Sequence, residues 1–418
     1  MTAPATEPFS LRSIALPAFG PGVMFGAAEG AVLPVVALTA LDLGAGVALA
    51  SVVYALIGIG SLLSNIPSAL ITQRYGERFA IILASGVSAA AMLVAMVAPD
   101  VAVLSLAMLM IGFANAVFSL ARQSFLTEAV PVHLRARALS TLGGSSRVGV
   151  FIGPFLAAGA IHLFGIRAAY AIGFLAALVA GAIGVLARDL VSTERGMEAG
   201  PEATTIRGVL RSHRSVFLTI GLGVVMISAV RASRQVILPL WAEHIGLSAT
   251  TNSLIYGIAG AIDMATFYPA GKVMDRRGRL WVALPSMLLL GVSLMLVPLS
   301  HSAPTLLVAA LLLGFGNGIG SGMVMTLGAD YAPAYARPAF LGIWRFLSDL
   351  GSCGGPVLLS VVTGAASLAT GVVGNGLLGF AAAGIIGYFV PRRRTVAQSG
   401  PDPASAGVSE GVGRQVAG

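Results

Sequence analysis

The amino-acid sequence predicts an all-α polytopic membrane protein with twelve transmembrane helices in two pseudo-symmetric halves of six helices. Three observations predict this class: the composition, the recurrence of apolar stretches and an internal repeat. Hydrophobic residues make up 56% of the 418 residues and charged residues only 10%, which leaves too little polar surface to cover a soluble globule of this length. Most of the chain is therefore expected to lie in lipid.

Apolar stretches long enough to cross a bilayer recur along almost the whole chain. A transmembrane helix needs about 20 mainly apolar residues. The expected spans are 14–39, 45–70, 80–98, 101–125, 138–160, 169–187, 216–241, 250–271, 280–299, 304–329, 339–361 and 366–388. The first span is too long for the core of a signal peptide and carries Glu29, so we expect it to be retained as a helix.

The positions of the basic residues predict how the chain is oriented in the membrane. The net charge of +8 would by itself be compatible with a nucleic-acid partner. With a cytosolic N-terminus, however, only Arg167 falls in an outer loop, five Arg fall within spans, and the other 19 of the 25 Lys and Arg residues are cytosolic. This asymmetry sets membrane topology, so we expect both termini on the cytosolic side of an inner membrane and no nucleic-acid partner.

An internal repeat with a shift of 202 residues relates the two expected halves. Equivalent pairs are Tyr54 and Tyr256, Gly58 and Gly260, Pro67 and Pro269, Asn115 and Asn317, Gly149 and Gly351, Gly153 and Gly355, and Pro154 and Pro356. Two parallel six-helix units explain this common register. A polar segment without an apolar run, 188–214, separates them. We therefore expect an N-terminal half at 1–187, a cytosolic linker, a C-terminal half at 215–390 and a disordered cytosolic tail at 391–418.

The loop after the eighth expected span carries a motif of glycines and charges. The residues that match the pattern G-x-x-x-D-R-x-G-R are Gly271, Asp275, Arg276, Gly278 and Arg279. This pattern resembles the loop signature of the major facilitator superfamily. The loop after the second span keeps Arg74, Gly76 and Arg78 but has Gln73 in place of the acidic residue. The resemblance implies a twelve-helix transporter in which these loops help to hold the two halves together on the cytosolic side.

The fifth expected span carries a second motif. Gly149, Gly153 and Pro154 follow the spacing G-x-x-x-G-P, which resembles the core of a motif of the drug and proton antiporters in the same superfamily. Gly lets helix backbones approach each other, and Pro kinks a helix. Two interpretations stay open for these residues, a hinge between the halves and helix packing alone.

Eight ionisable residues fall inside the expected spans, although each costs roughly 2.5–3.5 kcal/mol at a helix centre. They are Glu29, Arg122, Arg147, Arg231, Arg234, Asp263, Arg345 and Asp349. In the superfamily fold, helices 1, 4, 7 and 10 line a cavity and helices 2, 5, 8 and 11 flank the interface between halves. All eight residues lie on these helices. With the exception of Arg122, they form the candidate substrate and proton pathway, together with Asn115 and Asn317, whose alternative role is to hold helices together.

The repeat sets charges of opposite sign at equivalent positions. Glu29 is equivalent to Arg231, and Arg147 to Asp349, so we expect these charges to face each other across the pseudo-twofold axis. We hypothesise that Glu29 or Asp263 exchanges a proton during the transport cycle, because the surroundings of a membrane carboxyl group change when the halves move.

Two intramembrane arginines have simpler alternative roles. Arg345 lies one helical turn from Asp349, where the two residues can form a static ion pair. Arg122 lies near the cytosolic end of its span, from which its side chain can snorkel to the interface.

Together these features predict a secondary transporter that works by alternating access and exports a small organic compound in exchange for protons. The alternative within the same fold is a proton-coupled importer of an anionic metabolite, because the spans contain five Arg against three acidic residues. A membrane enzyme or a non-transporting sensor is poorly supported, since the sequence has no His and Cys cluster and no phosphate-binding loop.

The expected partners are the lipid bilayer, a small-molecule substrate and protons. We expect no cofactor and no metal, and we expect the chain to function as a monomer. The single cysteine, Cys353, excludes an intrachain disulfide and is expected to be an apolar packing residue.

Overall fold

The structure is a computed structural model that describes residues 15–129, 132–186, 206–333 and 336–390. Within these ranges the elements are helical and no strand occurs, which confirms the all-α class. Eleven of the described helices are long and apolar enough to cross a membrane. The twelfth is α11 (Ala249–Arg277), which carries Asp263 at its middle. The chain is thus a polytopic membrane protein of two six-helix halves.

The first half contains six spans, and the first of these is broken. It consists of α1 (Ala15–Val32) and α2 (Val36–Asp42), whereas one continuous helix was expected. The break lies at Pro34, which has no backbone N–H to donate and disfavours helical geometry in the residue before it. The other spans are α3 (Val47–Tyr75), α4 (Glu77–Val97), α5 (Val101–Ala129), α6 (Val132–Phe164) and α7 (Ala168–Leu186).

Two short helices precede the spans of the second half. Helix α8 (Ile206–Ser212) falls in the expected linker, and α9 (Arg214–Val216) begins at its last residue. A π-helical turn at Phe217–Gly221 leads into the first span. The long helices are α10 (Leu222–His244), α11, α12 (Leu280–Leu296), α13 (Ala303–Ile319), α14 (Met323–Tyr331), α15 (Arg337–Ala365) and α16 (Leu368–Phe389). Residues 188–205 and the expected tail lie outside the described ranges, so the domain boundaries stay predictions.

The tenth span is also broken, at the sequence Gly320-Ser321-Gly322 between α13 and α14. Gly322 has a φ of +78° and precedes the first residue of α14. A left-handed φ of this kind is readily adopted by Gly and disfavoured for other residues. The helix is therefore interrupted within the span Ala303–Tyr331, and backbone groups at the break are left for other partners.

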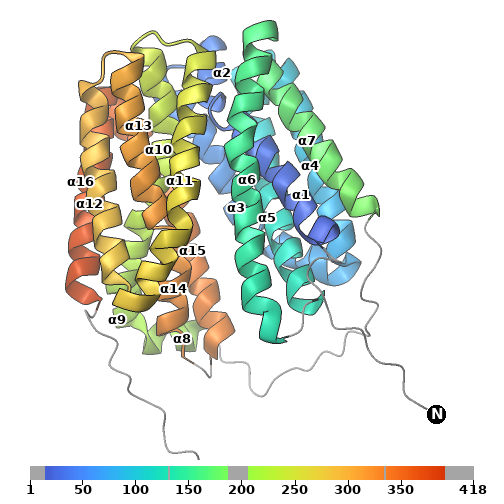
Figure 1. The fold of residues 1–418 in the computed structure, drawn as a ribbon, viewed down its shortest axis with the longest axis vertical. Coiled ribbons are helices and arrows are strands. Elements are labelled where there is room, and N and C mark those ends of the chain that lie inside the picture. Colours follow the sequence, from blue (N-terminus) through green and yellow to red (C-terminus); the bar gives the residue numbers. More distant parts are fainter. Residues whose placement is uncertain (1–14, 130–131, 187–205, 334–335, 391–418) are drawn as a thin grey trace, which may run out of the picture.

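The two halves meet through two pairs of helices that the repeat relates to each other. Helix α3 packs against α15, and α6 packs against α11. In Figure 1 the first half (blue to green) and the second half (yellow to red) stand side by side, with α6 and α11 at the front of the boundary between them.

Several contacts join the halves at the end of the molecule that holds α2. Asn252 donates a hydrogen bond to the Pro34 carbonyl oxygen at 2.9 Å, and Ser360 donates one to the Ala48 carbonyl oxygen at 2.7 Å. The ribbons of the halves lie close together at this end and diverge toward the end where α8 and α14 lie (Figure 1).

The motif glycines of α6 pack against α1 within the first half. A Cβ added to Gly149 would lie 2.6 Å from the Ala27 backbone nitrogen, and one added to Gly153 would lie 2.6 Å from the Ala31 backbone nitrogen. Their repeat equivalents, Gly351 and Gly355, meet the backbone of α10 in the same way. These glycines therefore permit close helix packing inside each half, while the helix that contains Pro154 continues from Val132 to Phe164.

Candidate functional site

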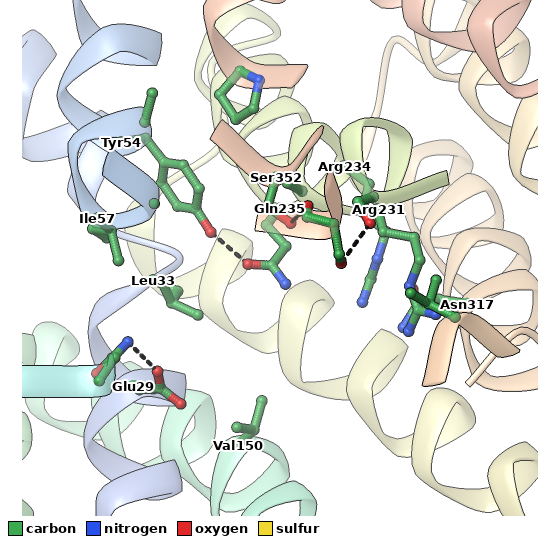
Figure 2. Close-up of a pocket in the computed structure, with 18 of the residues that line it drawn as sticks. Glu29, Leu33, Tyr54, Ile57, Val150, Arg231, Arg234, Gln235, Asn317 and Ser352 are labelled. Carbon is green, nitrogen blue, oxygen red and sulfur yellow. Dashed lines mark hydrogen bonds between the residues drawn. The ribbon is translucent and has the colours of Figure 1, made fainter. Parts of the chain in front are cut away.

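A cavity of about 560 Å³ lies between the two halves near the middle of the long helices. Residues of both halves line it, including six of the residues selected from the sequence: Glu29, Asn115, Arg147, Arg231, Arg234 and Asn317. Its wall also has apolar parts, formed by side chains such as Leu33, Ile57 and Val150. Figure 2 shows Glu29 on the opposite side of this space from Arg231 and Asn317.

Glu29 occupies the cavity wall of the first half. It lies on α1, four residues before the break at Leu33 to Val35, and it is partly buried. Asn115 of α5 donates a hydrogen bond from Nδ2 to Glu29 Oε1 at 2.5 Å. Among the described residues, Asn115 is the hydrogen-bond donor to the Glu29 side chain, and this donor is a neutral amide.

Asp263 is the centre of a charged cluster on the other side of the cavity. Its Oδ1 lies 3.4 Å from Arg147 of α6, and its Oδ2 lies 3.2 Å from Arg234 of α10. Asn317 of α13 donates to the same Oδ2 at 2.5 Å. Because α6 belongs to the first half and α11 to the second, the pair of Arg147 and Asp263 is an ion pair between the halves.

The two asparagines carry out the same contact in each half. Asn115 and Asn317 are equivalent in the repeat, and each donates its Nδ2 to a carboxylate at 2.5 Å. The carboxylates themselves are not equivalent, since Glu29 comes from α1 and Asp263 from α11. Each Asn also has a buried Oδ1 without a hydrogen-bond partner among the described residues. Asn115 and Asn317 therefore combine the two roles considered from the sequence: they line the cavity, and they join neighbouring helices.

Arg231 lies against the break between α13 and α14. Its Nη1 donates to the Gly320 carbonyl oxygen at 2.9 Å, and it makes no ion pair with a carboxylate among the described residues. The neighbouring Ser321 accepts a hydrogen bond from Arg147. The broken helix therefore gives two arginines of the cavity wall a partner that carries no net charge.

A hydrogen bond between the halves closes one side of the cavity. Tyr54 of α3 donates to Gln235 Oε1 of α10 at 2.5 Å, and Figure 2 shows the two side chains pointing toward each other. The sequence indicated Tyr54 only as the repeat equivalent of Tyr256, and it did not predict a role for Gln235. A polar residue one position after Arg234, on a helix that carries the cavity charges, was the available signal.

The expected facing of Arg147 and Asp349 is wrong. Arg147 pairs with Asp263, whereas Asp349 accepts a hydrogen bond from Asn65 of α3 at 3.0 Å. Arg345 Nε lies 3.9 Å from Asp349 Oδ2 on the same helix, which is the static pair of the alternative interpretation. Neither of these two residues is among those that line the cavity.

The expected snorkelling of Arg122 is also wrong. Arg122 of α5 is only 6% exposed. Its guanidinium donates to Ser146 Oγ at 2.9 Å and to Ser145 Oγ at 3.2 Å on α6, and it lies over the Phe118 ring. The two serines accept hydrogen bonds from both terminal nitrogens of the guanidinium inside the half, so the side chain is held in the bundle and does not reach the interface.

The loop motifs occupy the turns between the second and third helix of each half. Gly76 and Gly278 both have a positive φ, of 90° and 95°. Arg279 pairs with Asp330 at 2.8 Å, which ties α12 to the end of α14. At the position equivalent to Arg279, Glu77 accepts a hydrogen bond from Ser124 at 3.1 Å and so ties α4 to α5.

The other loop residues make contacts near their own helix ends. Arg78 donates to the Gly184 carbonyl oxygen at 3.3 Å and to that of Val185 at 2.5 Å. Arg74 lies over the Tyr75 ring, and Arg276 is exposed, whereas Gln73 and Gly271 lie on their helices before the turn. The side chain of Asp275 lies outside the described residues, so its expected role is not tested.

No group of three or more His, Cys, Asp or Glu side chains that could hold a metal ion occurs in the described part of the chain. The polar atoms of the cavity are guanidinium, carboxylate, amide and hydroxyl groups. Such a set can bind a polar organic molecule.

A central cavity between two six-helix halves, with costly charges facing it inside the membrane, defines a membrane transporter. The family model of the Major Facilitator Superfamily matches residues 21–356 and 220–406. The chain belongs to the Major Facilitator Superfamily. No curated protein matches it in sequence.

Solved structures of transporters share this fold. A D-xylose-proton symporter is 16% identical, with a TM-score of 0.67 over 91% of this chain and 98% of that one. A POT family transporter in complex with a thioalcohol-conjugated peptide is 13% identical, with a TM-score of 0.72 over 91% and 96%. The nucleoside transporter NupG is 12% identical, with a TM-score of 0.70 over 90% and 99%. At these identities the similarity concerns the fold.

Proposed function

We propose that this chain is a secondary transporter that moves a small organic compound by alternating access and couples the movement to protons. The observation that carries the proposal is a pair of carboxylates, each held by a repeat-equivalent asparagine of the cavity wall. Glu29 lines the cavity itself, and Asp263 contacts three residues that line it, Arg147, Arg234 and Asn317. Two halves that rock about a central site are the general mechanism of this fold.

The contacts between the halves support a state that is closed at one end. Asn252 with Pro34 and Ser360 with Ala48 join the halves at the α2 end, and Tyr54 with Gln235 joins them at the cavity wall. With a cytosolic N-terminus this end faces outward. The structure then corresponds to an inward-facing state, and transport requires these contacts to break.

Glu29 is the better candidate for the proton carrier. Its hydrogen-bond donor is the neutral Asn115, and no ion pair of Glu29 is found among the described residues. An amide can donate to a carboxylate or, after rotation, accept from a carboxylic acid, so Asn115 can satisfy Glu29 in both protonation states.

Asp263 has a different role in this proposal. Two arginines and Asn317 bind it, and Arg147 is the partner that comes from the other half. Separation of α6 from α11 would remove Arg147. Asp263 then becomes the residue that links the proton to the movement of the halves.

The test is transport in proteoliposomes with Glu29→Gln, Asp263→Asn and Glu243→Gln. Gln has the shape of Glu but cannot gain or lose a proton, and Glu243 is an exposed acid at the outer end of α10. We expect Glu29→Gln to abolish transport driven by a pH gradient while it retains counterflow, in which no net proton moves. Glu243→Gln should retain both. Coupled transport that survives in both Glu29→Gln and Asp263→Asn would contradict the proposal.

Export is the proposed direction. The spacing of Gly149, Gly153 and Pro154 resembles that of drug and proton antiporters, and this supports efflux. Proton-coupled uptake of an anionic metabolite is the second candidate, because Arg231 in the cavity has no carboxylate partner among the described residues. Expression should lower the accumulation of the substrate in intact cells if the chain exports, and raise it if the chain imports.

The cellular setting belongs to the same proposal. The distribution of Lys and Arg supports an inner membrane with both termini in the cytosol. The central cavity supports function as a monomer, since both of its walls come from the same polypeptide.

A further inference from the structure

The charges around the cavity are unbalanced, and the imbalance lies on one wall. Arg147, Arg231 and Arg234 line the cavity, and Asp263 is the carboxylate that binds two of them. Asp263 lies behind these arginines and is not among the lining residues, whereas Glu29 is an acid of the lining and lies on the opposite side (Figure 2). An uncompensated buried cation costs several kcal/mol, so this wall is expected to take up an anion.

Arg231 is the group with donors to spare. It makes one hydrogen bond among the described residues, from Nη1 to Gly320, whereas its Nη2 and Nε are not among the buried atoms without a partner and so remain accessible from the cavity. A guanidinium presents its donors in a planar fork that matches a carboxylate. Since Gly320 uses one donor, a second planar acceptor can bind the others.

A second polar group on the same wall also lacks a partner. Arg234 is 8% exposed, and its Nε has no hydrogen-bond partner among the described residues. A buried polar atom left unpaired costs about 1–3 kcal/mol, and an anion in the cavity removes that cost if it accepts from this atom.

The start of α14 adds to the positive potential at this place. Gly322, Val324 and Met325 line the cavity, and no side chain caps the first turn of the helix. The first N–H groups of a helix carry a partial positive charge and bind anions. Arg231 and the N-terminal end of α14 thus act on the same part of the cavity.

The remaining wall determines what the anion carries. Apolar side chains, among them Leu33, Ile57 and Val150, line the same cavity. Its volume of about 560 Å³ lies in the range of pockets that bind small organic molecules. An apolar body of one or two rings, or a short alkyl chain, fits this space.

We propose that the substrate is a small organic carboxylate whose carboxylate group binds Arg231 at the start of α14 and whose apolar body lies against the opposite wall. This rests on the proposed function and names the substrate class of the same cavity. Arg147 and Arg234 stay with Asp263, so the cavity distinguishes a monoanion from its neutral amide through Arg231.

Binding to the purified full-length chain in nanodiscs tests this inference. The probes are benzoate, phenylacetate and hexanoate, their amides, phenyl phosphate and benzylammonium, each titrated against thermal unfolding. The variants are Arg231→Gln, Arg231→Lys and Arg167→Gln. Arg167 also donates to a backbone carbonyl, that of Ala98 at 3.3 Å, but it lies in a loop outside the cavity and serves as the matched control.

We expect saturable stabilisation by at least one carboxylate and none by its amide or by benzylammonium. Arg231→Gln should weaken that binding by about tenfold or more, as expected for the loss of a charged hydrogen bond, whereas Arg231→Lys should weaken it less and Arg167→Gln should leave it unchanged. Equal binding of phenyl phosphate would assign the site to anions in general and overturn the carboxylate assignment.

The inference is also overturned if no carboxylate binds, if the amides bind equally well, or if Arg231→Gln binds as the parent does. Failure of the proposed function is a separate result, which transport measures and binding does not. In that case Glu29→Gln and Asp263→Asn would both keep proton-coupled transport, whether or not carboxylates bind at Arg231.

Discussion

Replacement of Gly153 by Ala tests whether α1 and α6 pack as closely as the structure shows. The added Cβ would lie 2.6 Å from the Ala31 backbone nitrogen and 2.8 Å from the Gly30 carbonyl carbon. An ordinary carbon contact needs about 3.5–4.0 Å, so the helices must separate by about 1 Å. Because the opposing atoms are backbone, no side-chain rotation relieves the clash, and we expect a loss of about 1–3 kcal/mol in stability.

The matched control is Gly159→Ala on the same helix, since a Cβ at Gly159 meets nothing within 4 Å. In the second half, Gly355 and its neighbour Gly354 make the same comparison one residue apart. A Cβ at Gly355 would lie 2.8 Å from the Ala229 carbonyl carbon, while one at Gly354 meets nothing within 4 Å.

Thermal unfolding of the four variants in one detergent gives the measurement. We expect Gly153→Ala and Gly355→Ala to unfold at lower temperature than the parent, and Gly159→Ala and Gly354→Ala to unfold at the parental temperature or above it. Equal stability within each pair would refute the close packing of α1 on α6 and of α10 on α15.

Two further predictions concern the charged cluster and the loops. Arg147→Gln and Asp263→Asn should each lower the stability of the chain. In a double-mutant cycle of thermal unfolding, the double variant should lose less stability than the two single variants together, by about 0.5–3 kcal/mol. Strict additivity would show that the ion pair between the halves does not form. Gly76→Ala and Gly278→Ala should each lower the stability by about 1–3 kcal/mol, because their φ values of 90° and 95° are strained for Ala. Gly271→Ala is the control, since a Cβ there meets open space, and it should not lower the stability. Equal effects at all three positions would exclude backbone strain as the cause.

The fold was predictable because lipid imposes length and apolarity on each span. The repeat then assigned the spans to two halves, and the charges inside them stood out because each is costly in a membrane. Six of the nine polar residues selected in this way line one cavity. The selection needed only the type of each residue and the helix on which it lies.

The partners of those charges were not predictable, because they depend on how each helix is rotated in the bundle. The sequence places two acids, Asp263 and Asp349, on helices that flank the interface, and either could pair with Arg147. The packing of α6 on α11 selects Asp263. The prediction that the Arg122 side chain extends to the membrane interface was wrong for the same reason, since its partners Ser145 and Ser146 lie on a different helix.

The helix breaks show a similar limit. Pro67, Pro154, Pro269 and Pro356 all lie within continuous helices, whereas the helix around Pro34 is interrupted. A proline alone therefore does not locate a break, because neighbouring helices can satisfy the freed backbone groups. The sequence Gly320-Ser321-Gly322 was a clearer signal, since two glycines flank a short polar residue.

The central claim is that the halves must separate at the α2 end during each cycle. A Cβ at Gly364 lies 3.6 Å from the Ala48 Cβ, a separation within the range of a disulfide. The measurement is proteoliposome transport by Ala48→Cys/Gly364→Cys in a Cys353→Ser background, before and after oxidation. We predict that oxidation abolishes transport and that a reducing agent restores it, with Ala48→Cys alone unaffected. Full transport by the completely cross-linked protein would contradict alternating access through this end.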